Sequence, residues 1–409
     1  MKTINHQTTM QIDEITLSHP PVQCLFFDIE TTGLSPRASS LYLIGTMAYD
    51  TVEDTTGNDT WKITQWFADK HRDEETILRL FLDTLEQYDY LYHFNGKTFD
   101  IPYLLHKANK YHIELSDHAS QILQDTTGNR SIDLLSQIRP LKKILGISKA
   151  GQTDLERWMG ITREDTYSGG ELISVYSQYM QDRILHPEQA EELEHVLLLH
   201  NHDDMEGMLT VSRMLHYRYL FDMTAALEKR LQITEITFHP SNQEHTSSLH
   251  LHFRHHAALP RSASLTGVFP LTKDPAPTFT VPPAILKLAE DTGILQVPVI
   301  STELKYFLPN PKEYYYLPSE DQAVHKSVAE FVDPSHRKKA TAATCYLRRS
   351  GKFLPALQPY KAGSDSFPQN IPVFLSVYRD KLGFYELPTD LVPENPFWKE
   401  YLIQTLRAW

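Results

Sequence analysis

The chain has 409 residues, of which 41% are hydrophobic, and this is enough for two packed domains rather than one. Its first ten residues, MKTINHQTTM, are polar and no apolar run reaches the length of a membrane helix, so we expect a cytoplasmic protein without a membrane partner. The formal net charge of −13 argues against indiscriminate binding to polyanions.

The first half of the chain has the pattern of an α/β domain. The segments VQCLFFDI, LYLIGTMAY and WKITQWF have the length and the residue content of strands, and we expect them to form a meander. A helix is predicted over residues 72–88, and DYLYHF is predicted to be a further strand. Helical patterns follow at 98–111, 133–138 and 169–182, and a long helix over 187–219 is expected to close the domain.

The second half is richer in loops and strands, because only six of the 25 prolines precede Ala226. Strand patterns occur in SLHLHFRHH, GILQVPVI, CYLRR and IPVFLSVYRD, and helices are predicted at 282–293 and 395–409. We therefore expect an N-terminal tail at 1–18, an α/β domain at 19–226, and a smaller β-rich α+β domain at 227–409.

Histidine and cysteine invite a metal interpretation at two places in the chain. His250 and His252 share one face of a predicted strand, but no carboxylate or cysteine joins them locally, so a solvated strand face is the favoured interpretation. Cys24 and Cys345 match no metal-ligand spacing, and we expect reduced thiols rather than a disulfide or a zinc site.

The first predicted strand ends in two carboxylates, Asp28 and Glu30. Alternate residues of a strand face the same way, so both side chains project from one face at its carboxyl end. Two such charges repel each other in a partly buried site unless a cation neutralises them. Taken alone, the pair fits a metal site and a solvated strand end equally well.

Two further acidic residues favour the metal interpretation. Asp100, in HFNGKTFDIPYLL, follows a strand and a glycine turn and lies near the start of a helix. Asp204, in LLLHNHDDMEGML, comes four residues after His200, so the two share an otherwise apolar helical face. A metal shared with other carboxylates would stabilise them there, although the two could instead pair with each other.

Three segments in this order, FFDIETTGL, HFNGKTFDIPYL and HNHDDMEG, resemble the motifs of the DEDD superfamily of 3′-to-5′ exonucleases, which has the ribonuclease H-like fold. SIDLLSQIRPLKKILG and TDLERWMGITREDTYSGGELISVYSQYM resemble the YprB-like branch of bacterial ribonuclease H-like proteins. The resemblance covers about residues 20–222. It implies a mixed central sheet flanked by helices and a nucleic acid substrate with a free 3′ end.

The resemblance also implies roles for individual residues. Asp28, Glu30, Asp100 and Asp204 would bind two Mg²⁺ or Mn²⁺ ions, hard cations that prefer oxygen ligands. Two such ions about 4 Å apart can clamp a phosphodiester while one activates water. No nucleotide cofactor is implied.

The spacing of the candidate general base differs from the pattern of the family. The family places a tyrosine four residues or a histidine five residues before the last aspartate, whereas this chain has His200 four residues before Asp204. His200 is our candidate base, because an imidazole suits that task near neutral pH. His195 and His202 are expected at the surface, and Asp203 is the register alternative to Asp204.

Other residues near the motifs are weaker candidates. Thr31, Asn95 and Phe99 could contact the terminal nucleotide, or could belong to the scaffold. Asp133 is expected to cap a helix, and Asp165 lies in a charged loop, so neither is favoured as a metal ligand.

A basic segment lies in the second half. Residues 334–364 contain seven lysines and arginines and no acidic residue. Because cations contact phosphates and aromatic rings stack on bases, Arg348, Arg349 and Lys352 are candidates for guiding a nucleic acid strand. A solvated face with core aromatics is the alternative.

Two functions therefore stand at this point: a metal-dependent 3′-to-5′ exonuclease acting on DNA or RNA, and a non-catalytic nucleic-acid-binding or regulatory protein on a nuclease fold. Nothing in the sequence identifies a protein partner.

Overall fold

The computed structural model describes residues 1–10, 17–50, 59–223, 225–241, 247–270, 281–361 and 371–409. The chain divides into two compact units, Met1–Arg218 and Tyr219–Trp409. The division falls before residue 226, where the sequence pattern ended the first domain. In the described part of the chain, no helix has both the length and the apolar character needed to cross a bilayer.

The first unit is built on a six-stranded mixed sheet with the order β1-β4-β3-β2-β5-β6. The strands β2, β3 and β4 pair antiparallel as the predicted meander, and β5 and β6 continue the sheet in parallel with β2. The strands are β1 (Lys2–Thr9), β2 (Cys24–Thr31), β3 (Leu41–Asp50), β4 (Thr60–Phe67), β5 (Tyr90–His93) and β6 (Ser131–Asp133). The predicted α/β class with a mixed central sheet is confirmed.

The strand β1 differs from the N-terminal tail expected at 1–18. Its residues pair antiparallel with β4 along their whole length, from Lys2 opposite Phe67 to Thr9 opposite Thr60. Most of its side chains are exposed, which is why its sequence lacks the apolar alternation of a half-buried strand. Backbone hydrogen bonds to β4 therefore hold this polar edge strand in the sheet.

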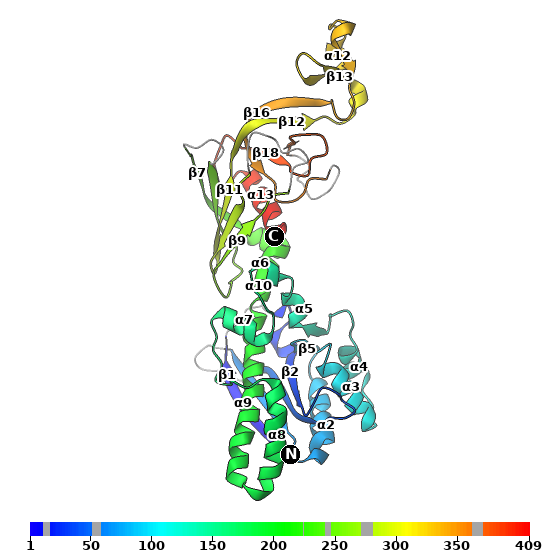
Figure 1. Ribbon diagram of the computed structural model, residues 1–409, viewed down its shortest axis with the longest axis vertical. Coiled ribbons are helices and arrows are strands. Elements are labelled where there is room, and N and C mark those ends of the chain that lie inside the picture. The colour runs from blue at the N-terminus through cyan, green and yellow to red at the C-terminus, as the bar shows by residue number, and fades with distance from the viewer. Residues whose placement is uncertain (11–16, 51–58, 224, 242–246, 271–280, 362–370) are drawn as a thin grey trace. The chain divides into compact units, whose positions relative to one another are not determined.

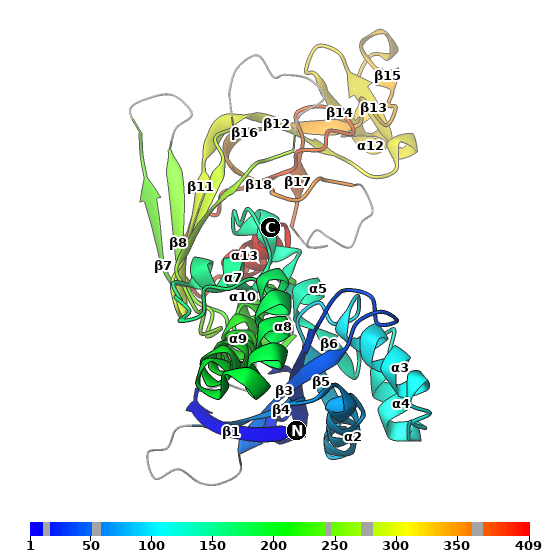
Figure 2. The ribbon, with the colours of Figure 1, turned by 60° about the horizontal axis from the view of Figure 1, so that its bottom comes forward.

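Helices flank both faces of the sheet (Figures 1 and 2). The strand β2 shows the division, because Phe27 packs against Phe81 of α2 on one face while Asp28 bonds to Asn201 of α9 on the other. The helices are α2 (Glu74–Leu85), α3 (Asp100–Lys110), α4 (Asp117–Leu123), α5 (Leu134–Ile138), α6 (Leu141–Ile144), α7 (Gln152–Met159), α8 (Gly169–Leu185) and α9 (Pro187–Ser212), and α10 (Leu215–Asp222) contains the boundary between the two units.

The single long helix predicted over 187–219 is wrong, because α9 ends at Ser212 and α10 begins at Leu215. Around the break, the backbone N–H groups of Arg213 and Met214 bond to carbonyls only three residues back, which tightens the last turn. The Ser212 hydroxyl also donates to the Leu209 carbonyl at 2.6 Å. The apolar pattern continues through the break, so periodicity alone did not reveal it.

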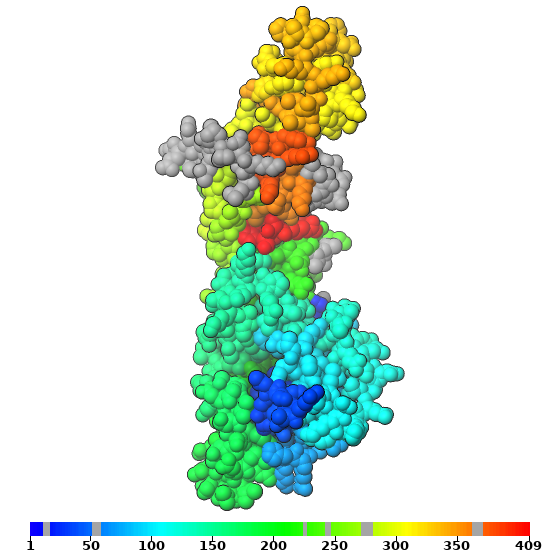
Figure 3. All heavy atoms as spheres, turned by 45° about the vertical axis from the view of Figure 1, so that its right-hand side comes forward, coloured from blue at the N-terminus to red at the C-terminus, as the bar shows by residue number. Residues whose placement is uncertain are grey.

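The second unit contains three antiparallel sheets. The first comprises β7 (Gln232–His239), β8 (Ser248–Arg254), β11 (Thr292–Pro298), β10 (Ala284–Leu288) and β9 (Ala263–Gly267). The second comprises β12 (Ile300–Phe307), β16 (Tyr346–Pro355), β18 (Phe384–Glu386) and β17 (Val373–Phe374). The third comprises β14 (Gln322–His325), β13 (Tyr314–Leu317) and β15 (Lys338–Lys339). In the sequence it is inserted between β12 and β16, and Figure 3 shows it in yellow and orange at the top of the view. The helices are α11 (Ala225–Arg230), α12 (Lys326–Ala329) and α13 (Pro396–Arg407).

This unit confirms the expected β-rich domain and corrects two of its predicted elements. The predicted helix at 282–293 is instead β10 with the start of β11, because Ala284, Leu286 and Leu288 are buried with a period of two. The predicted strand IPVFLSVYRD is reduced to Val373–Phe374, followed by a single antiparallel bridge from Leu375 to Lys305 of β12. The C-terminal helix is confirmed, with the Asn395 side chain accepting from the Phe397 N–H at 3.0 Å.

Candidate metal centre

The carboxyl end of β2 carries Asp28 and Glu30 toward α9. In the strand, Phe27 and Ile29 alternate with them and enter the hydrophobic core. Asp28 Oδ2 accepts a hydrogen bond of 3.1 Å from Asn201 Nδ2, and Glu30 Oε1 lies 3.5 Å from His200 Nε2. The period of the strand therefore directs both carboxylates to one helix, as the spacing predicted.

Asp100 opens α3, the helix that follows β5. A tight loop precedes it, in which Asn95 adopts a positive φ of 63° and donates its N–H to Asp133 Oδ1 at 3.0 Å. A Cβ at Gly96 would lie 2.9 Å from the His93 ring and 3.0 Å from Asp100 Oδ2, so this close approach requires glycine. Because β5 is parallel to β2, the loop and Asp100 lie at the same edge of the sheet as Asp28 and Glu30.

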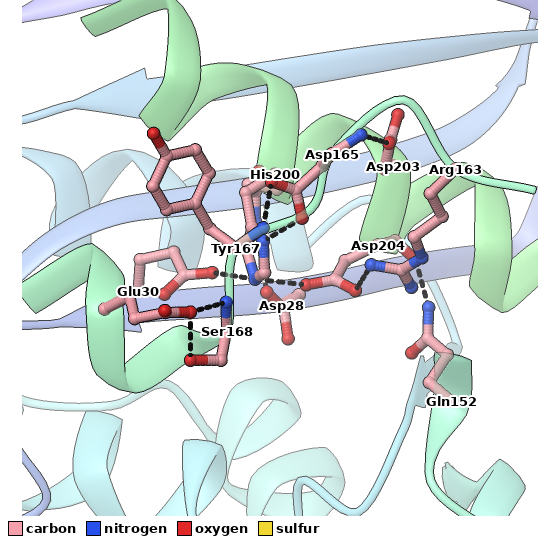
Figure 4. Close-up of polar contacts among 12 residues, drawn as sticks. Asp28, Glu30, Gln152, Arg163, Asp165, Tyr167, Ser168, His200, Asp203 and Asp204 are labelled. Atoms are coloured by element: carbon pink, nitrogen blue, oxygen red, sulfur yellow. Dashed lines mark hydrogen bonds and ion pairs between the residues drawn. The ribbon is translucent and has the colours of Figure 1, made fainter. Parts of the chain in front are cut away.

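The helix α9 supplies His200 and Asp204 from one face, as their spacing predicted. His200 Nε2 lies 3.3 Å from Asp204 Oδ2, and one ligand atom from each of Glu30, His200 and Asp204 lies within 4.8 Å of the others. Figure 4 shows the three side chains pointing toward one another, with Asp28 beside them. These three form an acidic group that could hold a metal ion.

The carboxylates repel one another strongly. Burial raises the pKa of Asp28 and Glu30 well above the usual values, and the charges of Asp204 and Asp100 raise both pKa values further. Burial raises the pKa of Asp100 to about 7, and it also raises the pKa of Asp204, although the charge of Arg163 opposes the latter shift. Asp28, Glu30, Asp100 and Asp204 thus share one electrostatic environment.

This donor set fits a hard divalent cation. Glu30 and Asp204 supply carboxylate oxygens, the ligand type that Mg²⁺ and Mn²⁺ prefer, and a cation would offset the repulsion among the buried carboxylates; Asp28 and Asp100 lie outside the group of three. Mutual repulsion among partly buried charges is costly in the absence of a cation.

The segment 152–168, which comprises α7 and the loop before α8, supplies residues that the sequence patterns missed. Asp165 Oδ2 lies 2.6 Å from His200 Nδ1, and Arg163 Nη1 lies 2.7 Å from Asp204 Oδ1. The segment also lines a pocket of about 820 Å³ that reaches His200 and Asp204. Asp165 was set aside because its loop is rich in charge, and no spacing rule connects a loop residue with a helix 35 residues later.

Asn201 is a second residue that the sequence patterns missed. Its side chain is fully buried and bonds to Asp28 and to Gln65, whose Nε2 donates to Asn201 Oδ1 at 2.9 Å. A buried asparagine next to a candidate helical histidine is the signal that could have identified it, because buried amides need partners.

The other candidates near the motifs lie in scaffold positions. The Thr31 hydroxyl donates to the Gly33 carbonyl at 3.0 Å, and Phe99 packs against Tyr103, with ring centroids 5.6 Å apart. Asp133 accepts from the Ser136 N–H, which confirms it as a helix cap. Asp203 accepts from the Asp165 N–H at 3.1 Å and does not join the acidic group.

Two other histidines of α9 were expected at the surface. His195 is exposed, whereas His202 is partly buried and lies 3.8 Å from Asp203 Oδ1. The partial burial of His202 differs from the expected surface position. His202 lies beside Asp203 and is not part of the acidic group.

The basic candidates lie on β16 in the second unit. Arg348 is paired with Glu303 and Arg349 with Glu386, at 2.8 Å and 2.7 Å. Lys352 Nζ lies 4.6 Å from the centroid of the Phe238 ring. The acidic partners come from β12 and β18, so a count of charges along residues 334–364 overstates how basic this surface is.

The predicted strand histidines lie on the face of β8 opposite its buried leucines. His250 and His252 are partly exposed, and the His250 ring lies 4.0 Å from that of His239. Among the described residues, the structure does not bring them into a group of three metal-ligating side chains.

The family model described as RNase H superfamily matches residues 25–216, so this region is similar to that superfamily. No curated protein matches the chain. Among solved structures, the family B DNA polymerase from Pyrobaculum calidifontis is similar at 14% identity and a TM-score of 0.36, covering 72% of this chain and 37% of the polymerase.

Escherichia coli exonuclease I, solved in complex with a dT13 oligonucleotide, is similar at 12% identity and a TM-score of 0.31. This match covers 60% of the chain and 56% of exonuclease I. The chain thus spans less than two thirds of either protein.

Proposed function

We propose that the chain is a DEDD-type, YprB-like 3′-to-5′ exonuclease that hydrolyses phosphodiester bonds of DNA or RNA with two Mg²⁺ or Mn²⁺ ions. The observation that carries the proposal is the convergence of Glu30, His200 and Asp204, whose ligand atoms lie within 4.8 Å of one another, with Asp28 beside them. Besides burial, the charges of Asp204 and Asp100 raise the pKa of Asp28 and Glu30, and perturbed carboxylates of this kind are typical of functional sites. The RNase H superfamily domain is consistent with this chemistry.

Each residue has a role in this proposal. The four carboxylates would hold the ions, which when bound lower the pKa of water and stabilise charge on the leaving oxygen. His200, whose Nε2 faces Glu30 and Asp204, would accept the proton of the attacking water. Asn201 keeps Asp28 directed at the site through its 3.1 Å hydrogen bond.

The substrate would be a strand with a free 3′ end. The pocket of about 820 Å³ beside His200 and Asp204 offers room for a nucleotide. Thr31, Asn95 and Phe99 do not line this pocket, and they remain only candidate contacts suggested by their place in the motifs. In the second unit, Arg348, Arg349 and Lys352 would contact the strand at phosphates.

Degradation of labelled strands tests the activity. Single-stranded and duplex DNA and RNA carrying a 5′ label are incubated with Mn²⁺, and stepwise shortening from the 3′ end is the expected result. A circular single strand of DNA serves as the control for end dependence, and its cleavage would indicate an endonuclease. We expect Asp28→Ala to lower the rate by at least about 100-fold, the upper end of effects seen for residues that only support a metal site.

A matched variant on α9 controls for general damage. Glu188 lies in the exposed first turn of the same helix as Asp204, so Glu188→Gln is expected to retain full activity. If Asp28→Ala degrades the strands as fast as the wild type, the assigned site is wrong. Binding of strands without any degradation would favour the non-catalytic alternative.

A further inference from the structure

The stretch between α7 and α8 contacts both residues of α9 that face the candidate metal centre. Arg163 and Asp165 lie two residues apart, and Figure 4 shows one directed at Asp204 and the other at His200. The side chain of Arg163 is 10% exposed and that of Asp165 is 3% exposed. Two charged side chains on one loop are thus almost completely buried against two neighbouring positions of the site.

We propose that Arg163 and Asp165 are positioning residues of the metal centre, Arg163 for the carboxylate of Asp204 and Asp165 for the imidazole of His200. This inference rests on the proposed function, in which Asp204 is a metal ligand and His200 is the base.

The contact of Asp165 selects one tautomer of His200. The carboxylate lies 2.6 Å from Nδ1, so Nδ1–H donates to Asp165, and Nε2 is the ring nitrogen that faces Glu30 and Asp204. Asp165 is itself fixed, because its Oδ1 accepts from the Tyr167 N–H at 3.0 Å and its own N–H donates to Asp203 at 3.1 Å. The loop therefore holds the imidazole in the orientation that a proton acceptor requires.

The two carboxylate oxygens of Asp204 have different partners, because Arg163 contacts only one of them. Oδ1 lies 2.7 Å from Arg163 Nη1, whereas Oδ2 lies 3.3 Å from His200 Nε2 on the side of Glu30. One oxygen is thus held by the protein and the other faces the centre. Carboxylates that bind metals commonly have such a partner on their outer oxygen.

A buried support behind Arg163 keeps the guanidinium in place. Glu156 of α7 accepts from both Nε and Nη2 of Arg163, and Gln152 donates to Glu156 Oε1 at 3.1 Å and to the Asp204 carbonyl at 2.8 Å. Gly207 of α9 makes room for this support, since a Cβ there would lie 1.9 Å from Glu156 Oε1. A buried glutamate is costly unless paired, and here its pairing orients the arginine.

The test separates positioning from a purely structural ion pair. Asp165→Asn removes the charge facing Nδ1, and the double variant Glu156→Gln with Arg163→Gln removes Arg163 from Asp204 without leaving Glu156 as an unpaired buried charge. Arg163→Lys keeps the charge but loses the paired N–H groups. Glu164→Gln, which changes the exposed residue between the two, is the matched control.

Three measurements are made on the full chain: the His200 tautomer by ¹⁵N NMR of the metal-free protein, the affinity for Mn²⁺ alone by calorimetry, and kcat and KM on a single strand. We expect Asp165→Asn to change the tautomer populations and to lower kcat about 10- to 100-fold with little change in KM. The double variant should weaken Mn²⁺ binding by about 10- to 100-fold, Arg163→Lys should recover part of that loss, and Glu164→Gln should match the wild type.

Folded variants with wild-type tautomer, Mn²⁺ affinity and kcat would overturn the inference and leave the proposed function standing. If the wild type degrades no strand, the proposed function fails, while the tautomer and Mn²⁺ measurements still decide whether the two residues position the site. If the double variant does not fold, the comparison of Arg163→Lys with the wild type decides the role of Arg163, because a structural ion pair predicts unchanged Mn²⁺ affinity for that variant.

Discussion

Gly45 of β3 lies directly against the side chain of Asn201 of α9, where a Cβ would come within 2.1 Å of Asn201 Oδ1. Asn201 is fully buried, and it bonds to Asp28 at 3.1 Å. The missing side chain at position 45 thus lets the helix approach the sheet closely enough for His200 and Asp204 to meet Asp28 and Glu30.

This relationship predicts that Gly45→Ala damages the metal centre and the fold together. The added methyl group must displace Asn201 or the helix, and overpacking of this kind costs about 1–3 kcal/mol. We expect urea denaturation to show a loss of that size in the free energy of unfolding, with weaker binding of Mn²⁺. Gly170→Ala in α8 is the control, because a Cβ there meets open space and alanine favours a helix. Equal stabilities for the two variants would contradict the prediction.

The stability of the metal-free first unit should fall as the pH rises. The pKa of Asp100 is raised to about 7, and those of Asp28 and Glu30 are raised as well. Between about pH 4 and pH 7 the folded state therefore holds protons that the unfolded chain has released, so deprotonation favours unfolding in this range. Thermal unfolding in EDTA should show the decline, and Asp100→Asn should reduce its slope.

Saturating Mn²⁺ should reverse this trend, because ligands must lose their protons to bind a metal. Glu188→Gln should keep the wild-type slope in EDTA, since it lies in the exposed first turn of α9. An unchanged slope in Asp100→Asn would show that the four carboxylates do not titrate as one site.

The sequence could predict how the main candidate ligands are oriented, because they lie at periodic positions. Asp28 and Glu30 alternate on a strand, and His200 and Asp204 are one helical turn apart, so local geometry determines which way each pair points. The order of strands and the parallel placement of β5 beside β2 then bring Asp100 to the same edge. The orientation of the two pairs follows from backbone repeats, which a sequence displays directly, whereas the place of Asp100 depends on the topology of the sheet.

The residues that the sequence did not reveal are those that depend on tertiary contacts. Asp165 and Arg163 lie in a loop without periodicity, and their partners on α9 are about 40 positions away. The ion pairs of Arg348 with Glu303 and Arg349 with Glu386 join different strands in the same way. The segment over 282–293 was assigned to a helix because its apolar residues fit both periods over so short a length.

The buried His255 should make the second unit less stable towards unfolding in acid. Burial lowers its pKa to about 4, and its Nε2 lies 3.2 Å from the carbonyl oxygens of both Ala289 and Thr292. As the pH falls from about 6.5 towards 4, the unfolded chain takes up the proton first, so the folded state loses up to about 3 kcal/mol. Hydrogen exchange of peptides from β10 and β11 should report this loss.

Two substitutions control the acid prediction. His255→Asn should remove most of the pH dependence while lowering stability at pH 7, because the two carbonyls lose their donor. His252→Asn, on the partly exposed side of β8, should leave the exchange of β10 and β11 unchanged. Acid sensitivity that persists in His255→Asn would assign the effect to another group.

Removing the basic side chains of β16 and removing their acidic partners should have opposite effects on the binding of nucleic acid. If this strand contacts phosphates, changing Arg348, Arg349 and Lys352 to glutamate should weaken binding of a single strand and flatten its salt dependence by about 0.7 per lost contact. Because Glu303 and Glu386 already pair with the two arginines, changing both to glutamine should release the arginines and strengthen binding. Fluorescence anisotropy at several salt concentrations measures both. Binding that responds to neither set would exclude β16 from strand recognition, because both sets change the net charge of the same surface in opposite directions.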